Sequence, residues 1–228
     1  MSSEPPAAKA PIQPAPPTPA IPRALASRAA LPPWAEQLVL LYESNAASQF
    51  ILHGNVEDRL LLPAGEGGVP GAVPGRPLGN LSDFLRQVLL PRFDVVLSYD
   101  LGSGTRVEKG GDVFATWPAL GETPELPKAP RPAIETLTRY FRYCANLSRL
   151  GKPALHVACI LRSAHLVVPA EGNVGGYELN ALALMIREWA TEELLTQHTL
   201  VTFLITESLN GLHPLLVNNP RVPALKVP

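Results

Sequence analysis

The stretch that decides the fold is Pro153–Pro169, PALHVACILRSAHLVVP. Its first half, Ala154–Leu161, is an almost unbroken apolar run between a Gly-Lys-Pro entry and the polar pair Arg162-Ser163. A run of this length with polar boundaries predicts a strand buried on both faces, as in the centre of a parallel α/β sheet. Ligands bind such sheets outside the carboxyl ends of the strands, so Arg162 and Ser163 mark an edge where a site is expected.

The composition limits the class of protein. A chain of 228 residues predicts one domain, with or without a tail, and 46% hydrophobic residues are enough for a core. A net charge of −1 gives no electrostatic support for a nucleic-acid partner. No apolar run reaches the roughly 18 residues of a membrane span. The two cysteines, Cys144 and Cys159, fit a reducing, cytoplasmic location without a disulfide framework.

Residues 1–33 differ from the rest of the chain. They hold ten of the 26 prolines, many alanines and few large apolar side chains. Such a segment buries too little surface to offset its ordering entropy, which predicts a disordered, partly polyproline tail. A mobile linker is the favoured interpretation, and docking of Pro14–Pro17 (Pro-Ala-Pro-Pro) to a protein partner stays open as the alternative.

From residue 34 onward, helical and strand periodicities alternate. Strands alternating with amphipathic helices predict an α/β fold with a doubly wound, mostly parallel five-stranded sheet. The polar segment 105–132 is predicted to be an excursion without a strand. The predicted strands are 49–53, 94–99, 154–161, 200–205 and 222–227, the last at an edge because of its two prolines, and the predicted helices are 34–44, 81–90, 133–150 and 177–198.

The residues after the first predicted strand do not form a phosphate-binding loop. No Gly-x-x-x-x-Gly-Lys-[Ser/Thr] motif occurs anywhere in the chain. The strand ends in His53-Gly54-Asn55-Val56-Glu57-Asp58, where Gly54 could turn the chain sharply but Glu57 and Asp58 would repel a polyphosphate. We therefore treat Gly54 and Asn55 as weak nucleotide-binding candidates only.

Two other strand ends carry polar side chains. Arg162 could contact a phosphate, but without a carboxylate beside it that strand end supplies neither a magnesium ligand nor a base. Thr206 and Glu207 end the following predicted strand, and Glu207 is a weak candidate for a catalytic base, against the simpler interpretation of a surface turn. The histidines show no metal-ligand spacing, so no metal site is predicted.

The order of these parts resembles the core ATPase domain of the AAA+ superfamily over residues 34–228. Phe50–Asn55 takes the first-strand position of that family, and Ile160–Leu166 (ILRSAHL) takes the position where the family has an apolar strand followed by Asp-Glu. Leu204–Pro214 (LITESLNGLHP) resembles the sensor strand and its continuation. Asn219-Pro220-Arg221 resembles the arginine that leads into the last strand.

This resemblance implies a P-loop NTPase-like core with degenerate motifs, because the phosphate-loop lysine and the acidic pair are missing. If any nucleotide binding is retained, the resemblance implies contacts at Gly54, Asn55, Arg162, Ser163 or Thr206. It also implies that Arg221 is an arginine that acts on the nucleotide bound by a neighbouring subunit of a ring. It also implies a module without the C-terminal helical lid, taken from a larger ATPase and assembled with other AAA modules as a homo- or hetero-oligomer.

Three hypotheses follow. The first is a non-hydrolysing AAA-like module for assembly, regulation or partner binding, with no cofactor expected. The second is an active ATPase that uses ATP and magnesium with an unusual loop at Gly54–Asp58 and Glu207 as base. The third is a Rossmann-like domain that binds a small molecule, which requires a pocket between the ends of the first and central strands.

Overall fold

The computed structural model describes residues 31–62, 78–121, 125–170, 176–197 and 199–228. The prediction of a disordered tail at 1–33 therefore lies almost wholly outside the described residues. Among the described residues, no helix is long and apolar enough to cross a membrane.

The centre of the structure is a six-stranded sheet in the order β5-β4-β6-β7-β1-β8. All neighbouring pairs run parallel except β4 and β5, which form an antiparallel hairpin. The α/β, mostly parallel class predicted from the sequence is confirmed. The strands are β1 (Gln49–Gly54), β4 (Val95–Asp100), β5 (Gly104–Lys109), β6 (Val157–Leu161), β7 (Leu200–Thr206) and β8 (Ala224–Val227).

The sheet has one strand more than the five predicted. The additional strand is β5, within the segment expected to be a polar excursion. Its sequence, GTRVEK, lacks the apolar alternation that indicates a half-buried strand, and only its first two residues are buried. Pairing with β4 and a hydrogen bond from Ser98 Oγ to Glu108 Oε1 (2.6 Å) hold it at the edge of the sheet.

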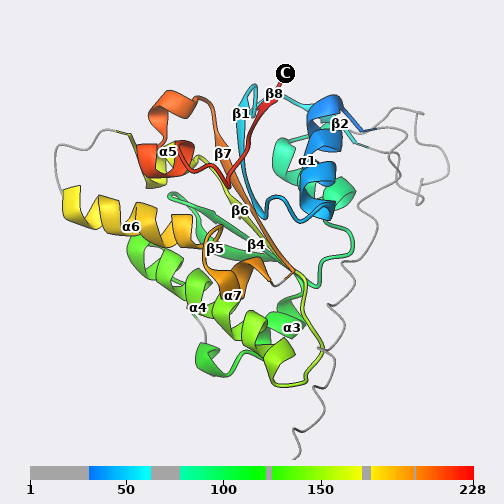
Figure 1. Cartoon of the computed structure of the whole chain (residues 1–228), viewed down its shortest axis with the longest axis vertical. Coiled ribbons are helices and arrows are strands. Elements are labelled where there is room, and N and C mark those ends of the chain that lie inside the picture. Colours follow the sequence, from blue (N-terminus) through cyan, green and yellow to red (C-terminus); the bar gives the residue numbers. More distant parts are fainter. Residues whose placement is uncertain (1–30, 63–77, 122–124, 171–175, 198) are drawn as a thin grey trace, which may run out of the picture.

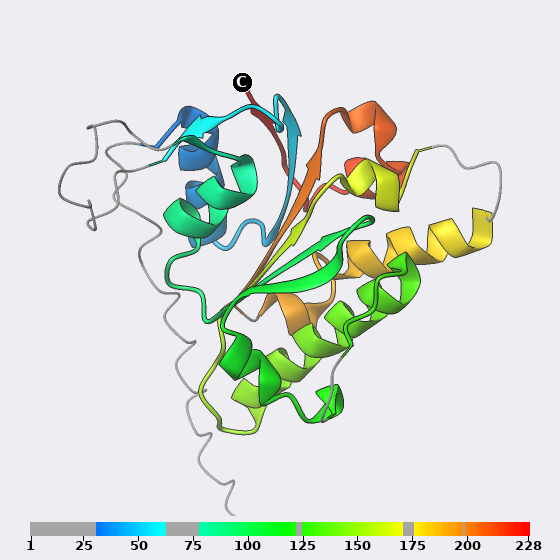
Figure 2. The same ribbon diagram turned by 180° about the vertical axis from the view of Figure 1, so that it is seen from behind.

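Helices cover both faces of the sheet (Figures 1 and 2). One face packs against α1 (Pro33–Glu43) and against α2 (Leu81–Phe84), which continues without interruption into the π-helical segment η2 (Leu85–Leu89). The other face carries the longer helices and the larger core cluster. Those helices are α4 (Pro130–Arg149), α5 (Ala164–Val167), α6 (Gly176–Glu188), α7 (Glu193–Thr196) and α8 (Pro214–Val217).

The remaining elements are short. They are a two-stranded ribbon of β2 (Leu60–Leu61) and β3 (Leu78–Gly79), helix α3 (Gly111–Ala115), and the turns η3 (Pro118–Leu120) and η4 (Leu209–Gly211).

The helix predicted at 177–198 is divided into α6 and α7. Between them the backbone tightens, and the N–H groups of Ala190 and Thr191 donate three residues back, to the carbonyls of Arg187 and Glu188. The first residue after α6, Trp189, contacts α4 at this break. Its indole N–H donates to Thr138 Oγ1 (2.9 Å). Local propensity alone would have continued the helix, and packing against α4 overrides it.

The connections place a topological switch point between β1 and β7. The chain leaves β1 toward α2 on one face, and it leaves β7 toward α8 on the opposite face. The carboxyl ends of β1 and β7 therefore meet where open α/β sheets bind their ligands.

Candidate functional site

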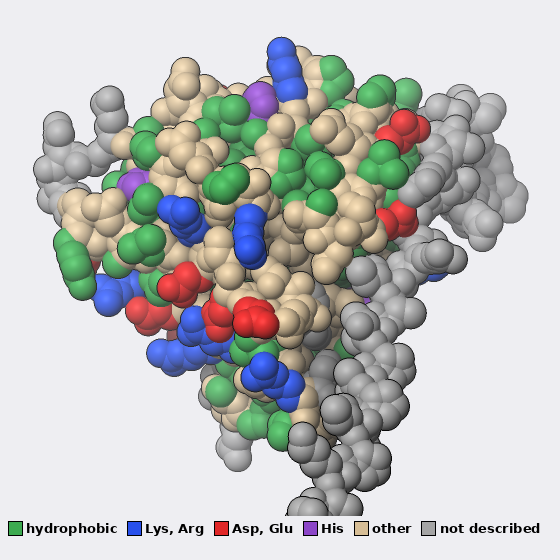
Figure 3. Space-filling model, in the orientation of Figure 1, with side chains coloured by type: hydrophobic (Ala, Val, Ile, Leu, Met, Phe, Trp, Pro, Cys, Tyr) green, Lys and Arg blue, Asp and Glu red, His purple; other side chains and the backbone are tan. Residues whose placement is uncertain are grey.

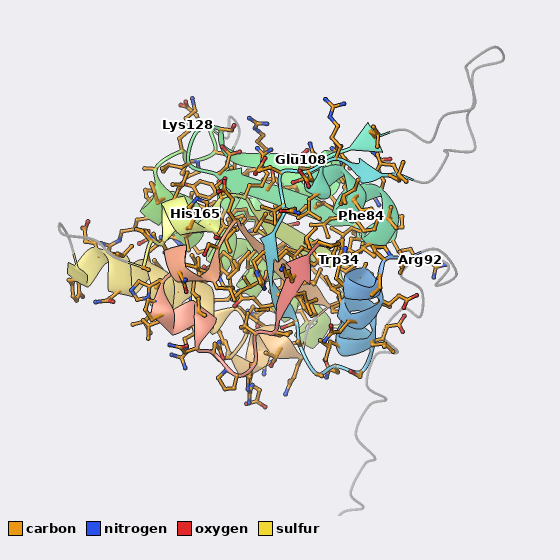
Figure 4. The ribbon with its side chains drawn as sticks, turned by 90° about the horizontal axis from the view of Figure 1, so that it is seen from above. Trp34, Phe84, Arg92, Glu108, Lys128 and His165 are labelled. Atoms are coloured by element: carbon orange, nitrogen blue, oxygen red, sulfur yellow. The ribbon has the colours of Figure 1, made fainter. Side chains whose placement is uncertain are left out.

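A cavity of about 340 Å³ opens at the carboxyl edge of the sheet, a size at the lower end of small-molecule pockets. Figure 4 looks onto this end of the molecule, with His165 of α5 on it. The cavity lies among the residues after β1, the turn between β4 and β5, the end of β6 and the start of α2. Its lining residues are Val56, Glu57, Asn80, Leu81, Ser82, Asp100, Leu101, Gly102, Ser103, Arg162, Ser163, Leu166 and Ile205.

The first turn of α2 borders this cavity and is capped by its own side chains. Asn80 Oδ1 accepts from the Asp83 N–H (2.8 Å), and the Asp83 carboxylate accepts from the Asn80 N–H (3.4 Å). This reciprocal capping box satisfies backbone donors that would otherwise be free to hold an anion. The Asp83 carboxylate also forms an ion pair with Arg86 of η2 (2.7 Å), so its charge is balanced within the helix.

Arg162 does not stand alone at the end of β6, because its Nη2 donates to Asp100 Oδ2 at the end of β4. The Ser103 N–H donates to the other carboxylate oxygen of Asp100 (2.6 Å). Burial alone would raise the pKa of Asp100, but the hydrogen bonds from Ser103 and Arg162 and the guanidinium charge lower it overall. Sequence reasoning missed Asp100, whose only signal was its place as the last residue of a strand.

Ser163 lies beside Arg162 and lines the same cavity. It adopts a left-handed conformation (φ 47°, ψ 48°), which turns the chain sharply from β6 into α5. A non-glycine residue in this region costs roughly 1 kcal/mol or more, and such residues cluster at functional sites. Arg162 and Ser163 therefore both line this cavity, as consecutive residues at the end of β6.

Thr206, at the end of β7, is 1% exposed and does not line the cavity. Its hydroxyl donates to the Ser208 carbonyl (3.0 Å), and His165 Nδ1 lies 3.1 Å from the same Oγ1. Because the hydroxyl has a single proton, His165 Nδ1 is the donor in this second hydrogen bond. Thr206 therefore joins β7 to α5.

The backbone N–H groups of Gly54 and Asn55 are used within the sheet. Gly54 donates to the Glu207 carbonyl (3.1 Å), and Asn55 donates to the Val227 carbonyl (3.1 Å). Gly54 has φ 103°, and a Cβ there would lie 2.5 Å from the Val227 oxygen, so only glycine fits. These donors link the ends of β1, β7 and β8 and are not free for a phosphate.

The two catalytic candidates lie apart from the cavity. Glu207 is exposed and does not line it. Arg221 precedes β8, at the amino edge of the sheet, where it lines a second cavity together with Ser48 and Gln197. Glu207 follows β7, the neighbour of β6, but does not line the cavity that Arg162 lines, and Arg221 lines the other cavity.

The cavity residues do not fit a nucleotide triphosphate with magnesium. Within the described ranges, its lining includes no lysine, and its two carboxylates are Glu57 and Asp100, the latter already engaged by Arg162 and Ser103. In the part of the chain that the structure describes, no group of three or more His, Cys, Asp or Glu side chains could hold a metal ion.

Comparison with known proteins gives one family. Residues 14–228 match the family described as "AAA+ chaperone, N-terminal Rossmann-like domain". None of the curated proteins matches the chain.

Proposed function

Because this chain belongs to the family of N-terminal Rossmann-like domains of AAA+ chaperones, we propose that it is a degenerate ATPase-like module of an AAA protein. The module serves assembly, regulation or partner binding and does not hydrolyse ATP. It works in the cytoplasm, in a homo- or hetero-oligomer with other AAA modules, and the parent protein supplies the ATPase activity.

The capping box at the start of α2 is the observation that carries this proposal. Helix N-termini at the carboxyl edge bind phosphate through free N–H groups. Here the Asn80 and Asp83 side chains take up such donors, and the Asp83 carboxylate is itself paired with Arg86. The neighbouring Arg162 is neutralised by Asp100, so the edge offers no uncompensated positive charge from this residue.

Exposed apolar side chains at the same edge support a role in partner binding. Leu101, in the turn after β4, is 45% exposed, and Leu166 of α5 is 57% exposed. Both line the cavity at the carboxyl edge, although they come from distant parts of the chain. Large apolar side chains that gather at the mouth of a cavity favour contact with another molecule.

ATP calorimetry on the 228-residue chain, with and without magnesium, tests the proposal together with a phosphate-release assay. We expect no heat of binding up to millimolar ATP and no turnover. Glu207→Gln should behave like the wild type, because Glu207 lies outside the cavity. Micromolar, magnesium-dependent binding, or turnover that Glu207→Gln abolishes, would instead establish the active ATPase.

A second candidate function, binding of a small molecule, is favoured by the position of the cavity. It lies between Val56-Glu57, just after β1, and Arg162-Ser163, just after β6. Native mass spectrometry of the purified chain tests it, with Ser82→Trp as a variant that fills the cavity. A bound molecule present in the wild type and absent from Ser82→Trp would support this function, and a wild-type chain without one would count against it.

A further inference from the structure

A second cavity, of about 320 Å³, opens at the opposite, amino edge of the sheet. Its walls are the loop 45–48 between α1 and β1, Ala190 after α6, Thr196 and Gln197 at the end of α7, and Arg221 before β8. Among the described residues, Arg221 is the one charged residue that lines it. This composition contrasts with the carboxyl-edge cavity, whose lining includes Glu57 and Asp100.

The backbone around Arg221 is held in place. Its N–H donates to Asn219 Oδ1 (3.1 Å), and the flanking residues Asn219 and Val222 are 3% and 4% exposed. The Arg221 side chain makes no hydrogen bond or ion pair with the described residues. A guanidinium on an anchored backbone, without a carboxylate partner, offers several N–H donors to an anion.

Neutral polar groups lie beside Arg221 in the cavity wall. Ser48 and Asn45 contribute a hydroxyl and an amide that make no side-chain hydrogen bond within the described residues. The C-terminal end of α1 is capped by the backbone that follows it. The Asn45 N–H donates to the Tyr42 carbonyl, and the Ala46 N–H donates to the Leu41 carbonyl. Those carbonyls are therefore partly satisfied, which reduces the partial negative charge at the end of α1. The ends of α6 and α7 also border the cavity, so the Arg221 guanidinium lies near three helix C-termini.

The nearby Gln197 side chain is engaged: its Nε2 donates to Glu193 Oε1 (2.8 Å). Glu193 itself does not line the cavity. As far as the structure describes the wall, it therefore combines one free cation with neutral donors and contains no carboxylate.

We propose that this amino-edge cavity binds an oxyanion, the phosphate or carboxylate group of a small ligand, with the Arg221 guanidinium as its charged partner and Ser48 and Asn45 as neutral donors. The site is independent of the function proposed above. Its volume lies near the lower limit of about 300 Å³ for small-ligand pockets, which suits a compact anion.

Calorimetric titration of the full chain at constant ionic strength tests the site, with inorganic phosphate in one arm and acetate in the other. Arg221→Ala should weaken binding at least tenfold, as expected for the loss of a charge-assisted hydrogen bond. The matched control is Arg106→Ala, which removes an exposed arginine of β5 that does not line either cavity. Circular dichroism melts of each variant establish that it is folded.

Saturable phosphate binding that Arg221→Ala abolishes and Arg106→Ala leaves unchanged would support a site for a phosphorylated ligand. The same pattern with acetate alone would support a site for a carboxylate. No saturable binding of either anion, or equal losses in the two variants, would overturn the proposal. Binding that Arg221→Ala does not weaken would overturn it as well.

Discussion

The guanidinium of Arg162 donates to the carboxylate of Asp100 across the carboxyl ends of the neighbouring strands β6 and β4. The two residues lie 62 positions apart in the sequence. Their pairing neutralises the charge of Arg162 at the part of the edge where ligands of α/β sheets bind. The stability of this edge therefore depends on the ionisation of Asp100.

Asp100→Asn should destabilise the protein by about 1–2 kcal/mol at neutral pH, because it leaves a half-buried guanidinium without its charged partner. The pKa of Asp100 is lowered in the folded state, so this stabilisation is complete above the ordinary value of 3.8 and is lost as the pH falls below it. Urea unfolding at pH 7 and pH 3 measures the effect. The difference between wild type and Asp100→Asn should shrink at pH 3.

Asp58→Asn, which changes an exposed aspartate in the turn after β1, is the matched control. Its free energy of unfolding should stay within about 0.5 kcal/mol of the wild type at both pH values. An Asp100→Asn variant as stable as the wild type at pH 7 would show that the ion pair contributes nothing.

Asn80→Ala should cost about 1 kcal/mol, because it removes the side-chain acceptor of the capping box at α2. The loss is measured by urea unfolding at neutral pH. Ser82→Ala, two residues later, removes a hydroxyl that makes no hydrogen bond with the described residues and should change stability by less than 0.5 kcal/mol. Equal effects of the two variants would contradict the capping role.

Both cysteines should resist thiol reagents while the protein is folded. Burial raises the pKa of Cys144 and of Cys159 to about 12, so the reactive thiolate is scarce at pH 8. A chromogenic disulfide reagent added at pH 8 should label neither thiol in the native protein and both in denaturant. Rapid labelling of one thiol in the native protein would show that its surroundings open.

The sheet strands other than β5 could be predicted from the sequence, because each is a run of apolar or alternating residues. The central strand, predicted at 154–161, is observed at Val157–Leu161 with every residue buried. The helix that ends at Arg149 followed from its apolar stripe and the Gly151 after it. Strand β5 could not be predicted, since Glu108 is held there by Arg86 of η2 and Ser98 of β4, contacts that no local pattern contains.

The candidate site could be predicted only in part. The polar residues after a buried strand indicated Arg162 and Ser163, because the carboxyl ends of parallel strands are a general place for ligands. The partner of Arg162 was not predictable, because Asp100 reaches it only through the pairing of β4 with β6. Arg221 was predicted as a functional arginine, but its position at the amino edge depends on the direction of β8.

His213 should make stability fall as the pH decreases through weakly acidic values. Its Nδ1 accepts from the Leu215 N–H (3.2 Å) at the start of α8, so its Nε2 carries the proton and donates to Asn180 Oδ1 (3.1 Å) on α6. Protonation of Nδ1 would remove this cap. Burial lowers the pKa of His213, so below the ordinary value of 6.5 the unfolded chain binds a proton that the folded chain does not.

His213→Asn tests this dependence, because asparagine can cap α8 without titrating. Urea unfolding at pH 7, 6 and 5 should show a smaller loss of stability in the variant, by up to about 1.4 kcal/mol per pH unit between 6.5 and the lowered pKa. His53 also has a lowered pKa, from burial and from Lys226, so part of the pH dependence should persist. His53→Asn should remove that part, and identical profiles for wild type and His213→Asn would refute the role of His213.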